Sequence, residues 1–354
     1  MSKYTAFFLP AIVNYLAYFL WSHGKGNITF AYATLAFIFI AIPLIDLVAI
    51  KRRSGTTAQS ATRSFADTAI PVLSLPVQIF NIFFFAWFIG SHDLPIHEIA
   101  ITVLTAGILS ALYAQNPAHE LIHHGTRFER AVGIMLFSTS IYSGAKLAHL
   151  YSHHVLAATD DDPTSANYGK SLYAFLPAAI AVNLFGWWGP KTKNTNGNVS
   201  RGYKVMLENL TGYTLSLGWG LMIFFLFGGK SLLLFIVQSF IGILVLEMMN
   251  YIGHYGLERK IDASGKCEAI SERHAWDCDM PFSNLVLISV QKHADHHINP
   301  NKSYDELRCV ENSPRLPLSY PMLFLLTLVP PLWRLVIHPR LDTYRSQWLV
   351  AGKQ

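Results

Sequence analysis

The sequence has few charged residues and few cysteines, and each shortage argues against a class of protein. Charged residues make up only 14% of the 354 residues, while 52% are hydrophobic; soluble domains carry about 25% charged residues. Cys267, Cys278 and Cys309 are odd in number and form no CxxC pair, which argues against a disulfide framework, an iron–sulfur cluster and a thiolate zinc site. The composition therefore indicates a membrane-embedded chain.

Two further absences concern partners and cofactors. The formal charge is +5, but lysine and arginine are scattered between apolar runs and form no stripe, so we expect no nucleic-acid partner. No GxGxxG motif follows a predicted strand, which argues against a bound nicotinamide or flavin. An oxidoreductase with this sequence would take its electrons from another protein.

Six uncharged runs are long enough to cross a bilayer, which takes about 20 apolar residues. These are Tyr4–Trp21, Ile28–Ile45, Thr68–Ser91, Ile99–Ala118, Asn209–Gly229 and Ser231–Leu246. The connection 47–67 carries Lys51, Arg52, Arg53 and Arg63, which predicts that this connection and both termini face the cytoplasm. We expect an all-α integral membrane protein with a single catalytic domain over 1–354, whose cytoplasmic cap comprises 119–208 and 247–354.

Three other apolar runs are harder to assign. Ala131–Ala145 is short, and Ser171–Pro190 and Leu316–Trp333 contain prolines and tryptophans, as is typical of segments at the membrane interface. Because the histidine clusters described next can form one site only on one side of the membrane, the chain must cross it an even number of times between any two clusters. Six spans satisfy that condition.

Ten of the 15 histidines fall into four short windows, all on the predicted cytoplasmic side. The windows are HELIHH (119–124), HLYSHH (149–154), the single His254, and HADHH (293–297). On a helix, residues three or four apart share a face, so each window with several histidines can direct two or three imidazoles at one point. His124 follows His123 directly and should point elsewhere, so we leave it out of the candidate set.

Imidazole is a common ligand of zinc, iron and copper. Nine histidines are too many for one ion, so the windows predict two metals, and an all-nitrogen site without thiolate suits iron. Carboxylates beside ligating histidines usually accept the second ring N–H. We expect this orienting role for Glu120 and Asp295, and Asp162 and His274 are further candidates for it.

These windows resemble the histidine boxes of the membrane fatty-acid desaturases and hydroxylases. Within that superfamily the flanking residues resemble the bacterial integral-membrane alkane hydroxylases. The matching segments are NPAHELIHH (116–124), HLYSHHVLAATDDDPTSA (149–166), NYIGHYGLERK (250–260) and SNLVLISVQKHADHHINPNKSYDELR (283–308). The resemblance covers residues 70–335.

The resemblance implies a non-haem diiron monooxygenase that hydroxylates the terminal carbon of alkanes with O2. It implies electrons from a rubredoxin-type or ferredoxin-type carrier with its reductase, an apolar substrate, and a place in the bacterial inner membrane with the metal site facing the cytoplasm. The implied ligands are His119, His123, His149, His153, His154, His254, His293, His296 and His297. We expect an apolar channel between the spans, with Phe80, Phe83, Phe84, Trp87, Phe235 and Phe240 as candidates for its lining.

The chain departs from the family pattern in three places. Ala148 and Gly253 stand where the family usually has glutamate before a histidine, and Asp160 stands where proline is common. If such a glutamate orients a ligand elsewhere in the family, another group must do so here.

Four other interpretations of the function remain open. An alkyl-aromatic hydroxylase and a desaturase share the metal site and differ in outcome. A membrane zinc protease would use His119-Glu120-Leu121-Ile122-His123 as an HExxH motif with Glu120 as general base. A metal transporter or sensor would also gather histidines, but near the middle of the bilayer.

Overall fold

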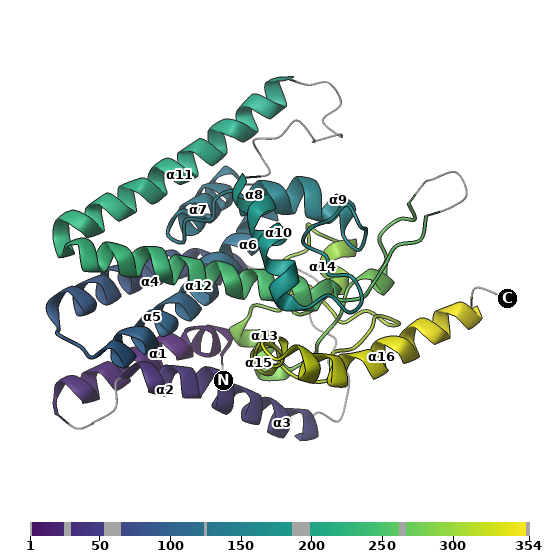
Figure 1. Cartoon of the computed structure of the whole chain (residues 1–354), viewed down its shortest axis with the longest axis horizontal. Helices are drawn as coiled ribbons and strands as arrows, with labels where there is room; N and C mark the ends of the chain where they lie inside the picture. Colours follow the sequence, from purple (N-terminus) through teal and green to yellow (C-terminus); the bar gives the residue numbers. More distant parts are fainter. Residues whose placement is uncertain are drawn as a thin grey trace.

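The computed structural model describes residues 2–24, 30–52, 65–123, 126–185, 199–261 and 267–351, and in these residues the chain forms helices and no β-strand ladder (Figure 1). Six helical segments are long and apolar enough to cross a membrane: Lys3–Ser22, Phe30–Ile50, Thr68–Ser91, Ile96–His123, Met206–Phe227 and Gly229–His254. The protein is thus an all-α, multi-pass membrane protein, and the predicted number of spans is confirmed.

The spanning segments correspond to the following helices. They are α1 (Lys3–Ser22), α2 (Phe30–Ala36) with η1 (Phe37–Ala41) and α3 (Ile42–Arg52), α4 (Phe65–Ser91), α5 (Ile96–Ser110) with η2 (Ala111–Gln115) and α6 (Asn116–His123), α11 (Val199–Phe227), and α12 (Gly229–His254). The labels η1 and η2 mark single π-helical turns inside longer helices. Such turns often occur at functional sites.

Two spanning helices run further than their apolar sequence. The fourth continues past Ala118 to His123, and the sixth continues past Leu246 to His254. The apolar sequence ends where polar side chains begin, but backbone hydrogen bonding continues the helix, and the polar side chains in these last turns are buried, as Glu120 is, or half-buried, as His119 and His123 are. His119, His123 and His254 therefore lie on the ends of spanning helices and not in separate cap segments.

The remaining helices form a cap over one end of the bundle (Figure 1). They are α7 (Arg127–Ser138), α8 (Ala145–Ala148), the π-turn η3 (His149–His153), α9 (His154–Leu156), α10 (Leu172–Phe185), η5 (Glu272–His274), α13 (Pro281–Val286), α14 (His293–Ile298), α15 (Tyr320–Thr327) and α16 (Pro330–Ala351). The described parts of the three ambiguous apolar runs correspond to α7, α10 and the α15–α16 region, and residues 186–190 of the second run lie outside the described residues. None of these is among the six candidate spans.

Helix α12 is the centre of the fold, because it packs against α4, α5, α10, α11 and α15. Its contact with α5 is especially close: a Cβ at Gly107 would lie 2.5 Å from side-chain atoms of Ile241. Small residues allow this approach between spanning helices. On the outside, Leu217, Phe225 and Leu226 of α11 are 60% exposed or more, as suits a face turned to lipid.

A buried carboxylate connects the second span to the cap. Asp46 of α3 is 1% exposed and accepts hydrogen bonds from the backbone N–H groups of Phe282 (2.7 Å) and Ser283 (3.1 Å) and from the Ser283 hydroxyl. These N–H groups belong to the first turn of α13, and the N–H groups of a first turn have no acceptor inside their own helix. Asp46 thus caps a helix from a distant part of the sequence and holds the cap against the bundle.

Candidate metal centre

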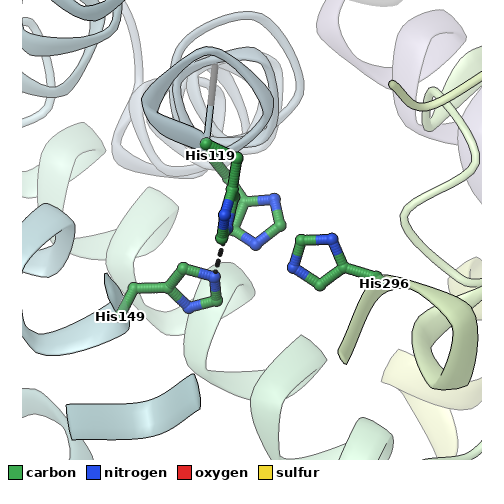
Figure 2. Close-up of side chains that lie close together, drawn as sticks. His119, His149 and His296 are labelled. Carbon is green, nitrogen blue, oxygen red and sulfur yellow. Dashed lines mark hydrogen bonds between the residues drawn. The ribbon is translucent and has the colours of Figure 1, made fainter. Parts of the chain in front are cut away.

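Eight histidines lie in two compact groups where the cap meets the bundle. The first group contains His119, His123, His149 and His296, and the second contains His153, His254, His293 and His297. Within each group, one nitrogen from every ring lies within 4.8 Å of the others. Figure 2 shows the rings of His119, His149 and His296, which come from α6, η3 and α14, directed toward a common point.

His154 lies between the two groups. Its Nε2 is 2.9 Å from Nε2 of His149 in the first group, and its ring centre is 4.6 Å from that of His297 in the second. All nine histidines proposed from the sequence therefore come together in one place. His124 lies outside the described residues.

The sequence windows do not map one to one onto the groups. His149 belongs to the first group and His153 to the second, and α14 contributes His296 to the first but His293 and His297 to the second. The expectation that each window directs its imidazoles at one point therefore holds for His119 and His123, but it is wrong for His149 and His153 and for the position of His296. The physical reason is that η3 and α14 lie between the groups and present rings to both.

The π-turn explains how three histidines of the second window face inward. Over His149–His153 the backbone forms a wider i→i+5 turn, in which the N–H of His154 donates to the carbonyl of His149. A regular α-helix would turn His154 about 100° away from His153. The wider turn instead brings His154 beside His149, from where it reaches both groups.

The spacing of the ring nitrogens suits a shared cation. The Nε2 atoms of His254, His293 and His297 form a triangle with sides of 3.0, 3.0 and 3.1 Å. An ion about 2.1 Å from each nitrogen, a usual metal–imidazole distance, fits just above this triangle. Nε2 of His153 and Nε2 of His296 are buried and have no hydrogen-bond partner in the described part of the chain. Buried polar atoms are rarely left unpaired, so each group holds a nitrogen that a metal would satisfy.

Hydrogen bonds set the tautomer of two rings in the second group. Nδ1 of His153 donates to Oδ2 of Asp162 at 2.8 Å, and Nδ1 of His254 donates to the carbonyl oxygen of His274 at 2.8 Å. Because a carbonyl oxygen only accepts, the proton of His254 sits on Nδ1, and its Nε2 presents a lone pair to the triangle.

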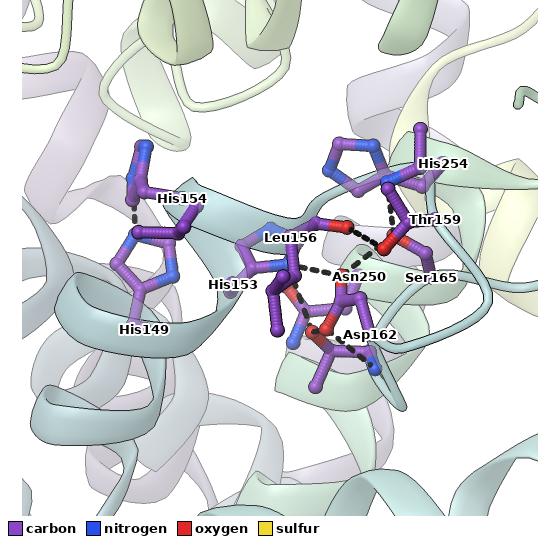
Figure 3. A network of polar contacts seen from close by, with 12 residues as sticks. His149, His153, His154, Leu156, Thr159, Asp162, Ser165, Asn250 and His254 are labelled. Carbon is purple, nitrogen blue, oxygen red and sulfur yellow. Dashed lines mark hydrogen bonds and ion pairs between the residues drawn. The ribbon is translucent and has the colours of Figure 1, made fainter. Parts of the chain in front are cut away.

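Asp162 is itself held by its neighbours (Figure 3). Its Oδ1 accepts from the N–H and the hydroxyl of Thr164 at 3.0 and 2.6 Å, and its Oδ2 accepts from the hydroxyl of Ser165 at 2.7 Å. Burial raises the pKa of Asp162, but His153 and these hydrogen bonds outweigh burial and lower the pKa to about 2. The side chain is therefore an ionised acceptor at neutral pH.

The other two residues expected to orient ligands have different contacts. Glu120 accepts from the backbone N–H of Tyr304 at 2.9 Å. Asp295 accepts from Lys302 Nζ at 2.8 and 3.0 Å, from Asn299 Nδ2 and from the N–H of Arg308. Both carboxylates thus join the histidine helices to the segment 299–308.

Five of the grouped histidines outside the spanning helices have lowered pKa values. Burial, followed by the charges of neighbouring histidines, holds the pKa values of His149, His154, His293, His296 and His297 well below their usual range. A metal competes with protons for imidazole nitrogens. At neutral pH these five rings are free of that competition.

Gly253 shows why this chain has no glutamate before His254. A Cβ at Gly253 would lie 2.7 Å from Cδ2 and 3.0 Å from Nε2 of His293, so the His293 ring packs directly against the backbone of α12. The orienting bond to His254 comes instead from the carbonyl of His274, which lies on η5. Sequence reasoning named His274 but expected its side chain to act.

A small cavity lies beside three of the histidines. Its lining includes His119, His149 and His153, the apolar residues Phe137, Ala145 and Leu246, and the polar residues Thr164, Asn183, Glu247 and Asn250. The six aromatic residues proposed as channel lining are not among the residues that line this cavity. Phe84 and Phe235 are buried in the bundle core, Phe83 is partly buried against it, and Phe80, Trp87 and Phe240 are exposed on its outside.

Sequence reasoning missed the polar wall of the cavity. The available signal was Glu247, the one acidic residue of α12, which stands three residues before Asn250 and seven before His254 and so shares a helix face with them. Asn183 and Tyr142 carry no such signal, because α10 and the turn before α8 meet this face only in the folded chain.

Comparison with known proteins agrees with the geometry. The model of the family described as fatty acid desaturase matches residues 97–327, which include every histidine of the two groups. The chain belongs to the fatty acid desaturase family. It is 32% identical to alkane 1-monooxygenase 2 of Alcanivorax borkumensis over 89% of this chain and 83% of that protein. Alkane 1-monooxygenase 1 of Pseudomonas aeruginosa is 34% identical over 68% of this chain and 63% of that protein.

The hydroxylase component XylM of a xylene/toluene monooxygenase from Pseudomonas putida is a more distant relative. It is 26% identical over 89% of this chain and 84% of that protein. The resemblance to alkane hydroxylases within the desaturase and hydroxylase superfamily is thereby confirmed.

Proposed function

We propose that this protein is an alkane 1-monooxygenase that uses O2 and two non-haem iron ions to hydroxylate the terminal carbon of alkanes. The observation that supports this most directly is the pair of four-histidine groups with His154 between them. The relatives with the name alkane 1-monooxygenase, of 32% and 34% identity, supply the substrate class. The alkyl-aromatic alternative is less favoured because XylM is only 26% identical.

The nine histidines named above are the proposed metal ligands. One ion would bind in each four-histidine group, and His154 is placed to serve either. All donors are imidazole nitrogens and none is a thiolate, which suits iron and leaves positions open for small molecules. Asp162 and the carbonyl of His274 keep the protons of His153 and His254 on Nδ1, so that their Nε2 atoms remain available.

When bound, the iron ions supply the oxidising power to break an unactivated C–H bond, which acid–base residues cannot do. The overall reaction consumes the alkane, O2, two electrons and two protons, and it yields the 1-alkanol and water. The protein's own part is to hold the ligands rigidly and to supply the apolar lining residues Phe137, Ala145 and Leu246, which can contact a hydrocarbon.

The electrons come from a separate carrier protein of the rubredoxin or ferredoxin type, supplied by its reductase. The cap bears exposed basic residues near the histidine segments, among them Arg127, Lys260 and Arg308, and an acidic carrier would be steered to such a surface. We place the cap on the cytoplasmic side of the bacterial inner membrane, where such carriers and the positive loops are found. The bundle and cap together form the single catalytic domain.

The zinc-protease alternative finds little support in the geometry. It needs Glu120 to act as general base beside one ion held by His119 and His123. The Glu120 carboxylate instead accepts from the backbone of Tyr304, and His119 and His123 share their group with His149 and His296.

The test is the metal content of the detergent-purified protein and of two variants. We expect about two iron ions per chain, with iron lost in His149→Ala. One zinc ion that survives His149→Ala but is lost in His123→Ala would instead indicate a protease. Turnover of an n-alkane under 18O2 with a reduced carrier should then place the label in a 1-alkanol; an unlabelled alcohol or an alkene would exclude the monooxygenase.

A further inference from the structure

The cavity beside the histidines contains a buried carboxylate that takes no part in holding them. Glu247 is 0% exposed and lines the cavity together with His119, His149 and His153. It lies within the sixth spanning helix, Gly229–His254. Charged side chains in spanning helices are costly, and they usually face a cavity and mark the path of a substrate or ion.

Three neutral donors hold Glu247, and each comes from a different place in the fold. Oε1 accepts from the Tyr142 hydroxyl at 2.5 Å and from Asn183 Nδ2 at 2.8 Å, and Oε2 accepts from Asn250 Nδ2 at 3.0 Å. Each carboxylate oxygen has about two acceptor positions. Among the described residues, Oε2 accepts from Asn250 alone, so it retains an acceptor position on a side chain that lines the cavity.

The residues that line the cavity are of two chemical kinds. Phe137, Ala145 and Leu246 are apolar, whereas Thr164, Asn183, Glu247 and Asn250 are polar. A hydrocarbon needs only the apolar residues, and it gains nothing from a buried carboxylate whose desolvation is costly. The cavity volume is about 20 Å³, room for a group the size of a water molecule, so the hydroxyl-bearing end of a molecule with a hydrocarbon chain suits it.

We propose that Glu247 is the hydroxyl-binding residue of this cavity and accepts a hydrogen bond from the O–H of a primary alcohol. The inference rests on the proposed hydroxylation, because the alcohol is then the product formed within the same cavity. By this bond Glu247 holds the new hydroxyl group, and the cavity therefore binds the alcohol more tightly than the alkane. The expected consequence is inhibition by the product.

The size of the preference follows from one added hydrogen bond. Such a bond strengthens binding by about threefold to tenfold. In Glu247→Gln, one oxygen becomes an NH2 group that cannot accept, and the three existing donors compete for the oxygen that remains. The affinity for the alcohol relative to the ether should therefore fall to that of an alcohol whose O–H finds no acceptor.

The experiment measures equilibrium binding of tritiated 1-dodecanol to the purified, metal-loaded protein in detergent. Competitors are unlabelled 1-dodecanol, n-dodecane and methyl undecyl ether. The ether is an isomer of the alcohol that keeps the oxygen lone pairs a metal could bind but has no O–H to donate. We expect the alcohol to compete about threefold to tenfold better than the ether, and we expect this difference to be lost in Glu247→Gln.

A matched control is Ser239→Ala on the same helix, where the hydroxyl donates, within the described part of the chain, to the carbonyl of Phe235. This variant should keep the wild-type ratio. Equal competition by alcohol and ether in the wild type, no saturable alcohol binding, or a ratio that survives Glu247→Gln would each overturn the proposal. If Glu247→Gln does not fold, the wild-type comparison of alcohol with ether decides. Failure of n-dodecane to compete would count against the proposed substrate but not against the hydroxyl-binding role of Glu247.

Discussion

Asp162→Asn tests whether the tautomer of His153 controls metal binding. In the wild type, Oδ2 of Asp162 accepts the Nδ1 proton of His153, while Oδ1 accepts from the N–H and hydroxyl of Thr164. An asparagine can place an oxygen on only one of these sides. If its NH2 group faces His153, the ring must carry its proton on Nε2, which then cannot bind a metal. If its NH2 group faces Thr164, it meets the backbone N–H, and two donors oppose each other.

The expected magnitude follows from either orientation. Loss of a carboxylate that orients a ligating histidine typically costs about 10-fold to 100-fold in metal affinity, or about 1.4 to 2.8 kcal/mol. The loss should be confined to the second group, because His153 belongs to that group. Titration with a chelator, followed by mass spectrometry of the retained metal, should show one ion released at about 10-fold to 100-fold lower chelator concentration than in the wild type.

Asp161→Asn is the matched control, because Asp161 is the adjacent acidic residue and its side chain is exposed. It should retain both ions as the wild type does. The reasoning is refuted if Asp162→Asn releases metal at the wild-type chelator concentration, or if it loses both ions together in a protein that is still folded.

Three further predictions follow from other contacts. Gly253→Ala should lower the metal content, because the new Cβ would lie 2.7 Å from the ring of His293; Gly218→Ala, with no atom within 4 Å of its Cβ, should leave the metal in place and raise helix stability by about 1 kcal/mol in thermal unfolding. Asp46→Ala should lower the free energy of unfolding by about 1–3 kcal/mol, because it removes the acceptor for the start of α13; denaturation in detergent measures this. Arg308→Glu should slow reduction by the carrier several-fold at low ionic strength in stopped-flow experiments, and the difference should shrink as salt is added.

Each of these predictions has a result that contradicts it. Full metal content in Gly253→Ala would mean that the His293 ring can move without loss of binding. Unchanged stability in Asp46→Ala would mean that α13 does not need the cap from α3. If the carrier reduces Arg308→Glu as fast as it reduces the wild type at low salt, the carrier docks elsewhere.

The sequence predicted the membrane architecture because hydropathy is a local property. Uncharged runs such as Thr68–Ser91 coincide with the helix of the structure, while the fourth and sixth spans end later than predicted because helical hydrogen bonding continues after the apolar residues stop. The direction in which these spans face stays a prediction. So does the membrane-interface position of the run Leu316–Trp333.

The sequence by itself determined which histidines gather, because the short windows and their spacing are visible without the fold. Only the tertiary structure decided how the rings divide, since His149 and His153 are four residues apart yet face different groups. It also decided that a backbone carbonyl, at His274, orients His254. Every residue has a carbonyl, so this role leaves no mark in the sequence. The polar residues around Glu247 likewise meet only because α10, α12 and the turn at Tyr142 pack together. Residue spacing within one segment does not predict contacts among three segments.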